Sequence, residues 1–146
     1  MKNIYLPLIL VGVLGGMLLQ CNMATAESMS IEMLNKKGKE KMLYSEDIAR
    51  IDVGDTITWL PASKGHNVQF VSVPDGVEKV KSKLSAEFSY TFEQEGAYLY
   101  VCTPHATMGM IGVVIVGDSD VNLAEVKKHK FRGKSKKKFK KILKAL

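Results

Sequence analysis

The chain of 146 residues has little cysteine, with only Cys21 and Cys102. Two cysteines are too few for a disulfide-stapled miniprotein or for a zinc site built from four thiolates. Aromatic residues make up 8% of the chain and charged residues 25%, which are the proportions of a globular protein. The length suits one domain with a core of ordinary size.

A hydrophobic run long enough to span a membrane comfortably is also missing. Residues 4–19 form an apolar stretch interrupted by one proline and three glycines, whereas a comfortable span needs ~20 residues. Lys2 precedes this stretch, and the small residues of Ala-Thr-Ala at 24–26 follow it. This order is typical of a secretory signal peptide. We therefore predict a signal peptide at 1–26, a periplasmic protein and a mature chain that begins at Glu27.

Two alternatives to cleavage are an uncleaved membrane anchor and a lipoprotein signal that ends at Cys21. The lipoprotein signal is disfavoured because Gln20 stands where a small residue is expected. Cleavage after Ala26 removes Cys21 and leaves Cys102 as a single cysteine in an exported, oxidising compartment. A single exported thiol is explained by a disulfide to another molecule, by a role as a reactive nucleophile or by binding of a metal.

Acidic residues are absent from 126–146, a segment that holds 11 of the 21 basic residues. Residues 27–125 carry 9 basic and 15 acidic side chains, a net charge of −6. The formal charge of +6 for the whole chain therefore conceals an acidic body and a basic tail. A basic chain can attract nucleic acid, anionic membrane or an acidic protein, but nucleic acid is not expected as the partner of an exported protein.

The basic tail has the pattern of an amphipathic helix. Asn122 followed by Glu125 resembles a capping box that opens a shorter helix before it. We expect the tail helix to pack on the rest of the protein with its lysines in solvent, and a helix lying on an anionic membrane is the alternative. The apolar residues at helical spacing in the tail are Phe139, Ile142, Leu143 and Leu146.

Between Glu27 and Val116 the signals are those of short strands. Alternating or β-branched segments are separated by turn sequences such as Pro-Asp-Gly at 74–76. Regularly spaced short strands without helical periods between them predict an all-β sandwich. The predicted strands surround Ile31 and Met33 and cover 56–60, 68–73, 88–92, 97–101 and 111–116.

The chemistry of the chain is concentrated between two of these strands. Cys102, His105, Met108 and Met110 occur within one nine-residue segment. Thiolate and thioether favour copper, imidazole binds it in both oxidation states, and a cysteine, two histidines and a distant methionine make a blue-copper site. His66, in a Lys-Gly-His-Asn sequence before a strand, is the candidate second histidine. The chemistry of the sequence does not decide between Met108 and Met110.

Other uses of these residues are less well supported. A lone buried cysteine is usually a small hydrophobic residue, and a lone histidine is usually solvated or hydrogen-bonded. A catalytic cysteine–histidine pair needs an orienting third group and an oxyanion pocket, and the sequence suggests neither. A thioether is a poor zinc ligand. The combination of Cys-x2-His-x4-Met with an upstream Gly-His-Asn therefore favours copper.

Four segments, 33–36, 54–56, 64–68 and 102–110, resemble the pseudoazurins, a group of cupredoxins. The resemblance extends over essentially the whole mature chain. It implies a cupredoxin-like Greek-key β-sandwich at 27–117, followed by a basic extension of two helices at 118–146. It also implies one copper ion per chain, cycling between Cu(I) and Cu(II), with Met110 rather than Met108 as the axial ligand. The ligands implied are His66, Cys102, His105 and Met110.

The resemblance and the residue types also suggest supporting roles. Asn67 would tie the His66 segment to the Cys102 loop, and Pro104 would stiffen that loop and remove a backbone donor. Met42 corresponds to a methionine near the site in the family, although a place in the core is an equal alternative. Four protein ligands leave no open position for a substrate, which favours electron transfer over catalysis.

Pseudoazurins carry lysines around the exposed copper-ligand histidine, and three lysines here match such positions. We expect His105 to be the exit point for electrons, beside a small apolar patch, while the lysines steer an acidic partner. The predicted docking residues are Lys36, Lys64, Lys83, Ala106 and Met108.

The sequence therefore predicts a monomeric periplasmic electron carrier without stable membrane insertion. The resemblance implies a respiratory reductase, such as the nitrite reductase of denitrification, as acceptor and an upstream quinol-linked carrier as donor. Two alternatives stay open. One is a copper-binding or copper-delivery protein, and the other is a membrane-surface module that docks through its basic C-terminal helix.

Overall fold

The computed structural model describes residues 26–117 and 119–146. The predicted signal peptide lies outside the described residues except for Ala26. The two helices are α1 (Leu123–Lys128) and α2 (Gly133–Ala145), and the two short 3-10 turns are η1 (Thr103–His105) and η2 (Ser119–Val121). The strands are β1 (Ser28–Lys37), β2 (Glu40–Tyr44), β3 (Ile48–Ile51), β4 (Thr56–Leu60), β5 (Gln69–Ser72), β6 (Phe88–Thr91), β7 (Gly96–Val101) and β8 (Ile111–Val116).

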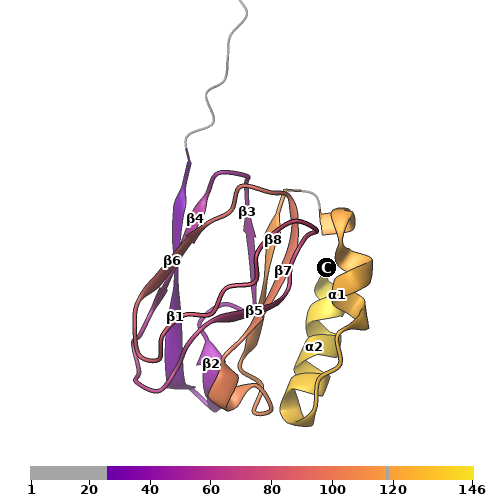
Figure 1. Ribbon diagram of the computed structural model, residues 1–146. Coiled ribbons are helices and arrows are strands. Elements are labelled where there is room, and N and C mark those ends of the chain that lie inside the picture. Colours follow the sequence, from indigo (N-terminus) through magenta and orange to yellow (C-terminus); the bar gives the residue numbers. More distant parts are fainter. Residues whose placement is uncertain (1–25, 118) are drawn as a thin grey trace, which may run out of the picture.

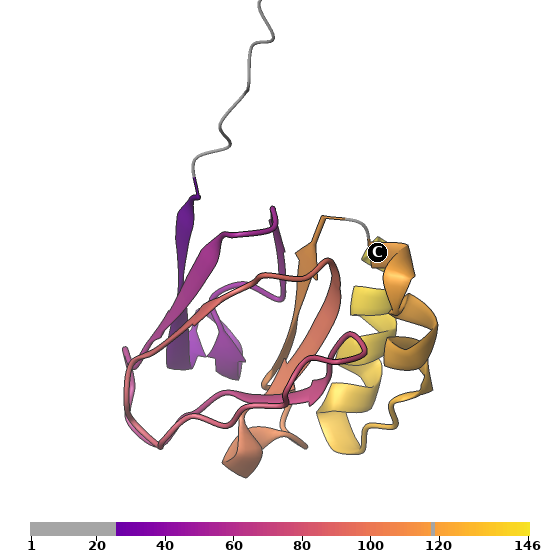
Figure 2. The same ribbon diagram turned by 45° about the horizontal axis from the view of Figure 1, so that its top comes forward.

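The strands form two four-stranded sheets that face each other (Figure 1 and Figure 2). One sheet has the order β2-β1-β4-β6 and the other the order β3-β8-β7-β5. β1 runs parallel to β4, and β3 runs parallel to β8, while the remaining neighbours are antiparallel. The predicted all-β sandwich is confirmed.

The inner faces of the sheets enclose an aromatic core. The ring of Trp59 lies 5.2 Å from that of Tyr100 and 6.1 Å from that of Phe70, measured between ring centroids. Cys102 and Met110 are fully buried members of the same core. The candidate metal ligands are therefore anchored in the most rigid and least hydrated part of the protein.

Six predicted strands are present, and two further strands, β2 and β3, were missed. β2 follows β1 through a turn at Gly38, whose φ of +60° suits glycine, and pairs with the end of β1. Met42, Leu43 and Tyr44 are consecutive in β2, so the strand lacks the alternation that marks a half-buried strand. β3 has only four residues and finds its parallel partner, β8, far along the chain.

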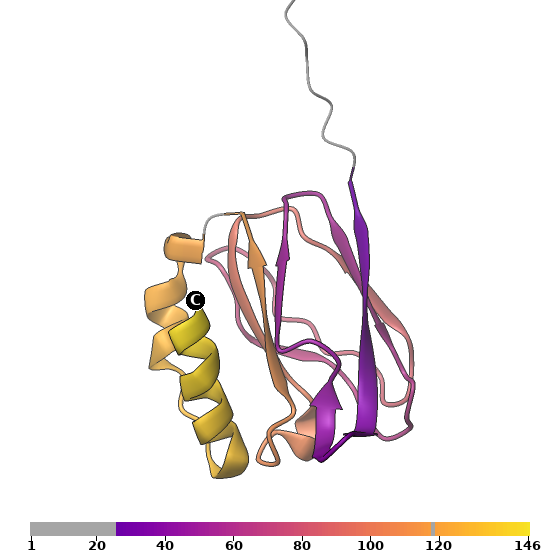
Figure 3. The ribbon, with the colours of Figure 1, turned by 180° about the vertical axis from the view of Figure 1, so that it is seen from behind.

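The two helices cover the outer face of the β3-β8-β7-β5 sheet (Figure 3). Phe139 and Ile142 of α2 are buried against this sheet, with Leu143 and Leu146 partly buried beside them. The predicted apolar stripe and its packing are confirmed. Among the described helices, none has both the length and the apolar character needed to cross a membrane.

The predicted capping box at the start of α1 is wrong. α1 begins directly after Asn122, but the Asn122 side chain makes no cap. Its Oδ1 accepts a hydrogen bond from the Ala97 backbone nitrogen at 2.6 Å, and its Nδ2 donates to the Ala97 carbonyl at 2.9 Å. Glu125 pairs instead with Lys128. Asn122 therefore fastens the helical extension to β7.

Candidate metal centre

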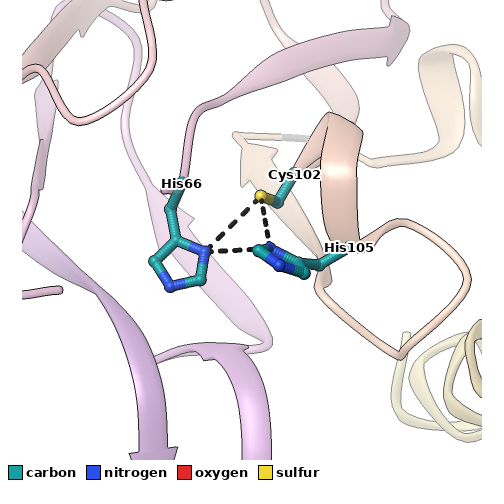
Figure 4. Close-up of side chains that lie close together, drawn as sticks. All are labelled: His66, Cys102 and His105. Atoms are coloured by element: carbon teal, nitrogen blue, oxygen red, sulfur yellow. Dashed lines mark hydrogen bonds between the residues drawn. The ribbon is translucent and has the colours of Figure 1, made fainter. Parts of the chain in front are cut away.

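Three side chains from two segments of the chain converge on one point (Figure 4). Their ligand atoms all lie within 4.8 Å of one another. The Cys102 Sγ is 3.6 Å from Nδ1 of His66 and 3.4 Å from Nδ1 of His105, and the two Nδ1 atoms are 3.1 Å apart. The structure thus brings together one thiol and two imidazole nitrogens, which is the predicted donor set. His66 and Cys102 are 36 residues apart in the sequence.

The loop after β7 is a tight turn that places Cys102, His105 and Met110 near one another. Pro104 stands in the first turn of η1, where a missing N–H costs nothing. The backbone nitrogen of His105 donates to the Cys102 carbonyl at 3.1 Å. The Cys102 nitrogen donates to the Met110 carbonyl at 3.0 Å, so the loop closes on itself.

The two candidate methionines differ in exposure. Met110 is fully buried in the same core as Cys102, whereas the side chain of Met108 is 41% exposed. The short backbone connection from Cys102 to Met110 holds the latter beside the thiol. The structure therefore favours Met110 as the thioether of this site.

Burial shifts the pKa values of His66 and Cys102. It lowers the pKa of His66, with a further lowering from His105, so the imidazole is neutral and free to bind a metal. Burial also raises the pKa of the Cys102 thiol, although the backbone N–H groups of Asn67 and His105 oppose this. A bound cation would supply the positive charge that favours the thiolate.

Asn67 joins the segment of His66 to the turn that follows Cys102, as predicted. Its Oδ1 accepts hydrogen bonds from the backbone nitrogen and the hydroxyl of Thr103, at 2.9 and 3.0 Å. Asn67 is almost completely buried. The hydroxyl of Tyr44 donates to the Asn67 carbonyl at 2.6 Å, a contact that sequence reasoning missed.

Asn35 is a second residue that sequence reasoning missed in this role. Its Oδ1 lies 2.8 Å from Nε2 of His66. When Nε2 carries the proton and donates it to Asn35, Nδ1 has a free lone pair. Nδ1 is the atom that faces Cys102. Asn35 belongs to 33–36, one of the segments that resemble the pseudoazurins. Sequence spacing does not predict its contact with His66, which is 31 residues away.

Met42 is half-buried and packs against the core that contains Cys102 and Met110. Its φ of +53° is unusual for a residue other than glycine. Met42 therefore lies at the edge of the core, one of the two places predicted for it, and a place near the site stays a prediction.

The predicted docking residues belong to the segments around His66 and His105. Lys64 stands two residues before His66, and Lys36 follows Asn35. The segment that contains Lys83 is held to the His66 segment, because the Ser85 nitrogen donates to the His66 carbonyl at 2.8 Å. The three lysines are exposed, as is Met108, and Ala106 is partly exposed.

The sequence and structure are similar to those of known copper proteins. Residues 31–117 match the model of the copper binding proteins of the plastocyanin/azurin family. Pseudoazurin of Methylorubrum extorquens is 38% identical over 106 residues, which are 71% of this chain and 72% of that protein. Pseudoazurin of Paracoccus pantotrophus is 37% identical over 113 residues, 76% of this chain and 78% of that protein. The crystal structure of pseudoazurin from Hyphomicrobium denitrificans has a TM-score of 0.77 at 34% identity and covers 82% of this chain and 98% of its own.

Proposed function

Because the chain belongs to the plastocyanin/azurin family of copper-binding proteins, and within it to the pseudoazurins, we propose that it delivers single electrons to a respiratory reductase in the periplasm. Copper is its cofactor, and it is a blue-copper electron carrier rather than an enzyme. The observation that carries the proposal is the triangle of donor atoms from His66, Cys102 and His105.

The proposed ligands are His66, Cys102, His105 and Met110. Copper held by them would supply one-electron chemistry between Cu(I) and Cu(II). Burial keeps the His66 imidazole neutral, and the Cys102 thiol would release its proton when the metal binds. Asn35 fixes the ring of His66, and a buried, hydrogen-bonded donor set limits the rearrangement that each change of charge demands.

His105 is the proposed point of electron exit. His66 and Cys102 are fully buried, whereas His105 is partly exposed and lies beside Ala106 and Met108. A partner that docks over this patch approaches the site more closely than it could elsewhere on the described surface.

The proposed partner is an acidic protein such as a nitrite reductase, and the donor is an upstream quinol-linked carrier. The lysines at 36, 64 and 83 are exposed on segments that adjoin His66 and would accelerate encounters with negative surfaces. Rates of electron transfer to the reductase should fall as salt is added, because salt screens exposed charges. A rate that does not change with salt would contradict steering by these lysines.

We also propose that residues 1–26 are removed on export, that 27–117 form the copper domain, and that 118–146 are its helical extension. The sequence order of the leader and the single remaining thiol support this division. The mass of the protein recovered from the periplasm should correspond to a monomeric chain that begins at Glu27. A protein retained with the membrane at full mass would contradict cleavage.

The visible spectrum of the Cu(II) protein tests the site most directly. An intense thiolate-to-copper band is expected, and Cys102→Ser should abolish it. Met110→Leu should shift the band and the reduction potential, whereas the matched change Met108→Leu should leave both unaltered. A colourless protein that retains zinc, or an equal response to both methionine changes, would contradict the proposed ligand set.

Two alternatives make different predictions. A copper-delivery protein would yield its copper readily to chelators and would not cycle reversibly at an electrode. A membrane-surface module would co-sediment with anionic liposomes, and removal of the residues after 117 would abolish this. The burial of Phe139 and Ile142 against the sheet weighs against the membrane module, because it occupies the apolar face that would enter lipid.

A further inference from the structure

A groove of about 980 Å³ runs between α2 and the hairpin formed by β1 and β2. Figure 3 shows α2 and this hairpin on the same side of the molecule. At one end the groove reaches Gly109 in the loop between His105 and Met110. Its remaining apolar lining comes from Met42 and Leu43. We call it the lysine groove.

The lysine groove is strongly positive. Six lysines of α2 line one side of it, and Lys39 and Lys41 line the other. Glu40 and Asp47 are the only acidic residues in its lining among the described residues. Asp47 is paired with Lys138, and no other groove lysine forms an ion pair within the described part of the chain. Seven lysines without an ion pair therefore line one concavity, against a single further carboxylate, that of Glu40, among the described residues.

Such a cluster is unfavourable by itself, because like charges on one helix face repel. Packing of the opposite face of α2 on the sheet holds the lysines together. Fixed repulsion of this kind is relieved when an anion binds, and the relief adds to the affinity for it.

The shape of the groove selects the kind of anion. A flat bilayer would touch the exposed faces of α2 and the hairpin without entering a concave surface between them. An extended polypeptide fits better, since α2 has 13 residues and is about 20 Å long, which an extended chain covers with roughly six residues. Carboxylates on both sides of such a strand would reach lysines on both walls.

We propose that the lysine groove binds an extended acidic segment of a protein partner, with its aspartate and glutamate side chains between α2 and the β1–β2 hairpin. The lysines at 36, 64 and 83 are not part of its lining, although Lys36 is the cross-strand neighbour of Lys41. The proposal holds whether or not the protein transfers electrons, because the residues that line the groove are outside the proposed ligand set.

A titration of the full Cu(I)-loaded chain with a hexaglutamate peptide, followed by amide NMR, tests the proposal. Shifts are expected in 39–43 and along α2, with binding that weakens as salt is added. Changing Lys137, Lys140 and Lys141 to glutamate should weaken binding at least tenfold. The control changes Lys127, Lys130 and Lys136 to glutamate, which alters the net charge equally outside the groove and should weaken binding less than threefold.

A second variant, Lys39→Glu with Lys41→Glu, tests the opposite wall without altering α2 and should also weaken binding at least tenfold. Retention of the thiolate-to-copper band checks that each variant is folded. Equal weakening by the groove and control variants would overturn the proposal, and so would peptide shifts centred on 64–66 and 105–108. Binding to phosphatidylglycerol vesicles without binding to the peptide would also overturn it and would point to a membrane surface.

Discussion

Ser135, in the first turn of α2, donates its hydroxyl to the backbone carbonyl of Ala106, the residue that follows His105. The next carbonyl, that of Thr107, accepts a hydrogen bond from the Lys134 nitrogen at 2.9 Å. No side chain caps the start of α2. The loop between two proposed copper ligands therefore caps the helix, and the helix holds the loop.

Ser135→Ala should loosen this attachment. Ser135 is fully buried, so the change removes the donor to the Ala106 carbonyl and should lower the free energy of unfolding by about 1 kcal/mol. Copper should also be lost to a chelator faster, because His105 is on the loosened loop. Ser135→Thr, which keeps a hydroxyl, should restore slow release. Unaltered copper release in a destabilised alanine variant would show that Ser135 acts on stability alone.

Two glycines provide a matched comparison of the same attachment. Gly133 and Gly38 both have a φ of +60°, which alanine adopts at a cost of about 1 kcal/mol. A Cβ at Gly38 meets nothing, whereas a Cβ at Gly133 collides with the Thr107 carbonyl. Gly38→Ala should therefore cost about 1 kcal/mol and Gly133→Ala about 3 kcal/mol, since a clash with a backbone carbonyl adds to the strain.

Denaturant unfolding of the two alanine variants measures this difference. Gly133→Ala should also perturb the absorption of bound Cu(II), because the displaced residue is next to the metal loop. Equal destabilisation by the two changes would mean that the contact between Gly133 and Thr107 does not constrain the loop.

Asn67→Ala should destabilise the junction between the two segments that contain His66 and Cys102. The change leaves the Thr103 nitrogen and hydroxyl without their acceptor, at a cost of about 2 to 3 kcal/mol. Thr103→Val removes only the hydroxyl bond and should cost about 1 kcal/mol. Thermal unfolding of the copper-free variants measures both. If Thr103→Val is as unstable as Asn67→Ala, the loss of the Thr103 hydroxyl accounts for most of the destabilisation.

The buried tyrosines predict loss of stability at high pH. Burial raises the pKa of Tyr98 to about 12, and it also raises the pKa values of Tyr44, Tyr90 and Tyr100. An unfolded tyrosine loses its proton near pH 10, so above that pH the unfolded state binds fewer protons than the folded one. The contribution of these tyrosines to stability should therefore be constant below about pH 10 and fall between about pH 10 and 12.

Denaturant unfolding as a function of pH, together with tyrosinate absorbance, checks this expectation. Tyr98→Phe should cost about 1 kcal/mol at neutral pH, because the Tyr98 hydroxyl donates to the Gln94 carbonyl at 2.8 Å. It should also make the alkaline decline shallower. A stability that rises above pH 10 would contradict the direction assigned to these pKa values.

Local patterns in the sequence determined most elements and the donor set. Alternation located three strands because burial on one face of a sheet repeats every two residues, and apolar or β-branched runs located three more. The spacing of Phe139 and Ile142 located the face of α2 that packs. Cys102 and His105 stand three residues apart on one loop, so their proximity follows from local chain geometry. The nature of these donors indicated copper before any fold was considered.

Only the tertiary structure decided the contacts between distant segments. It buried Met110 and exposed Met108, although the two are nearly adjacent. It directed Asn122 to Ala97 instead of to a helix cap, and it joined Ser135 to Ala106 across 29 residues. The periodicity of apolar residues in the sequence indicates which side chains are buried. Which residues they contact depends on which strands pair and how the helices pack on them. The lysines of α2 illustrate this, because their number is visible in the sequence and their convergence on one groove is not.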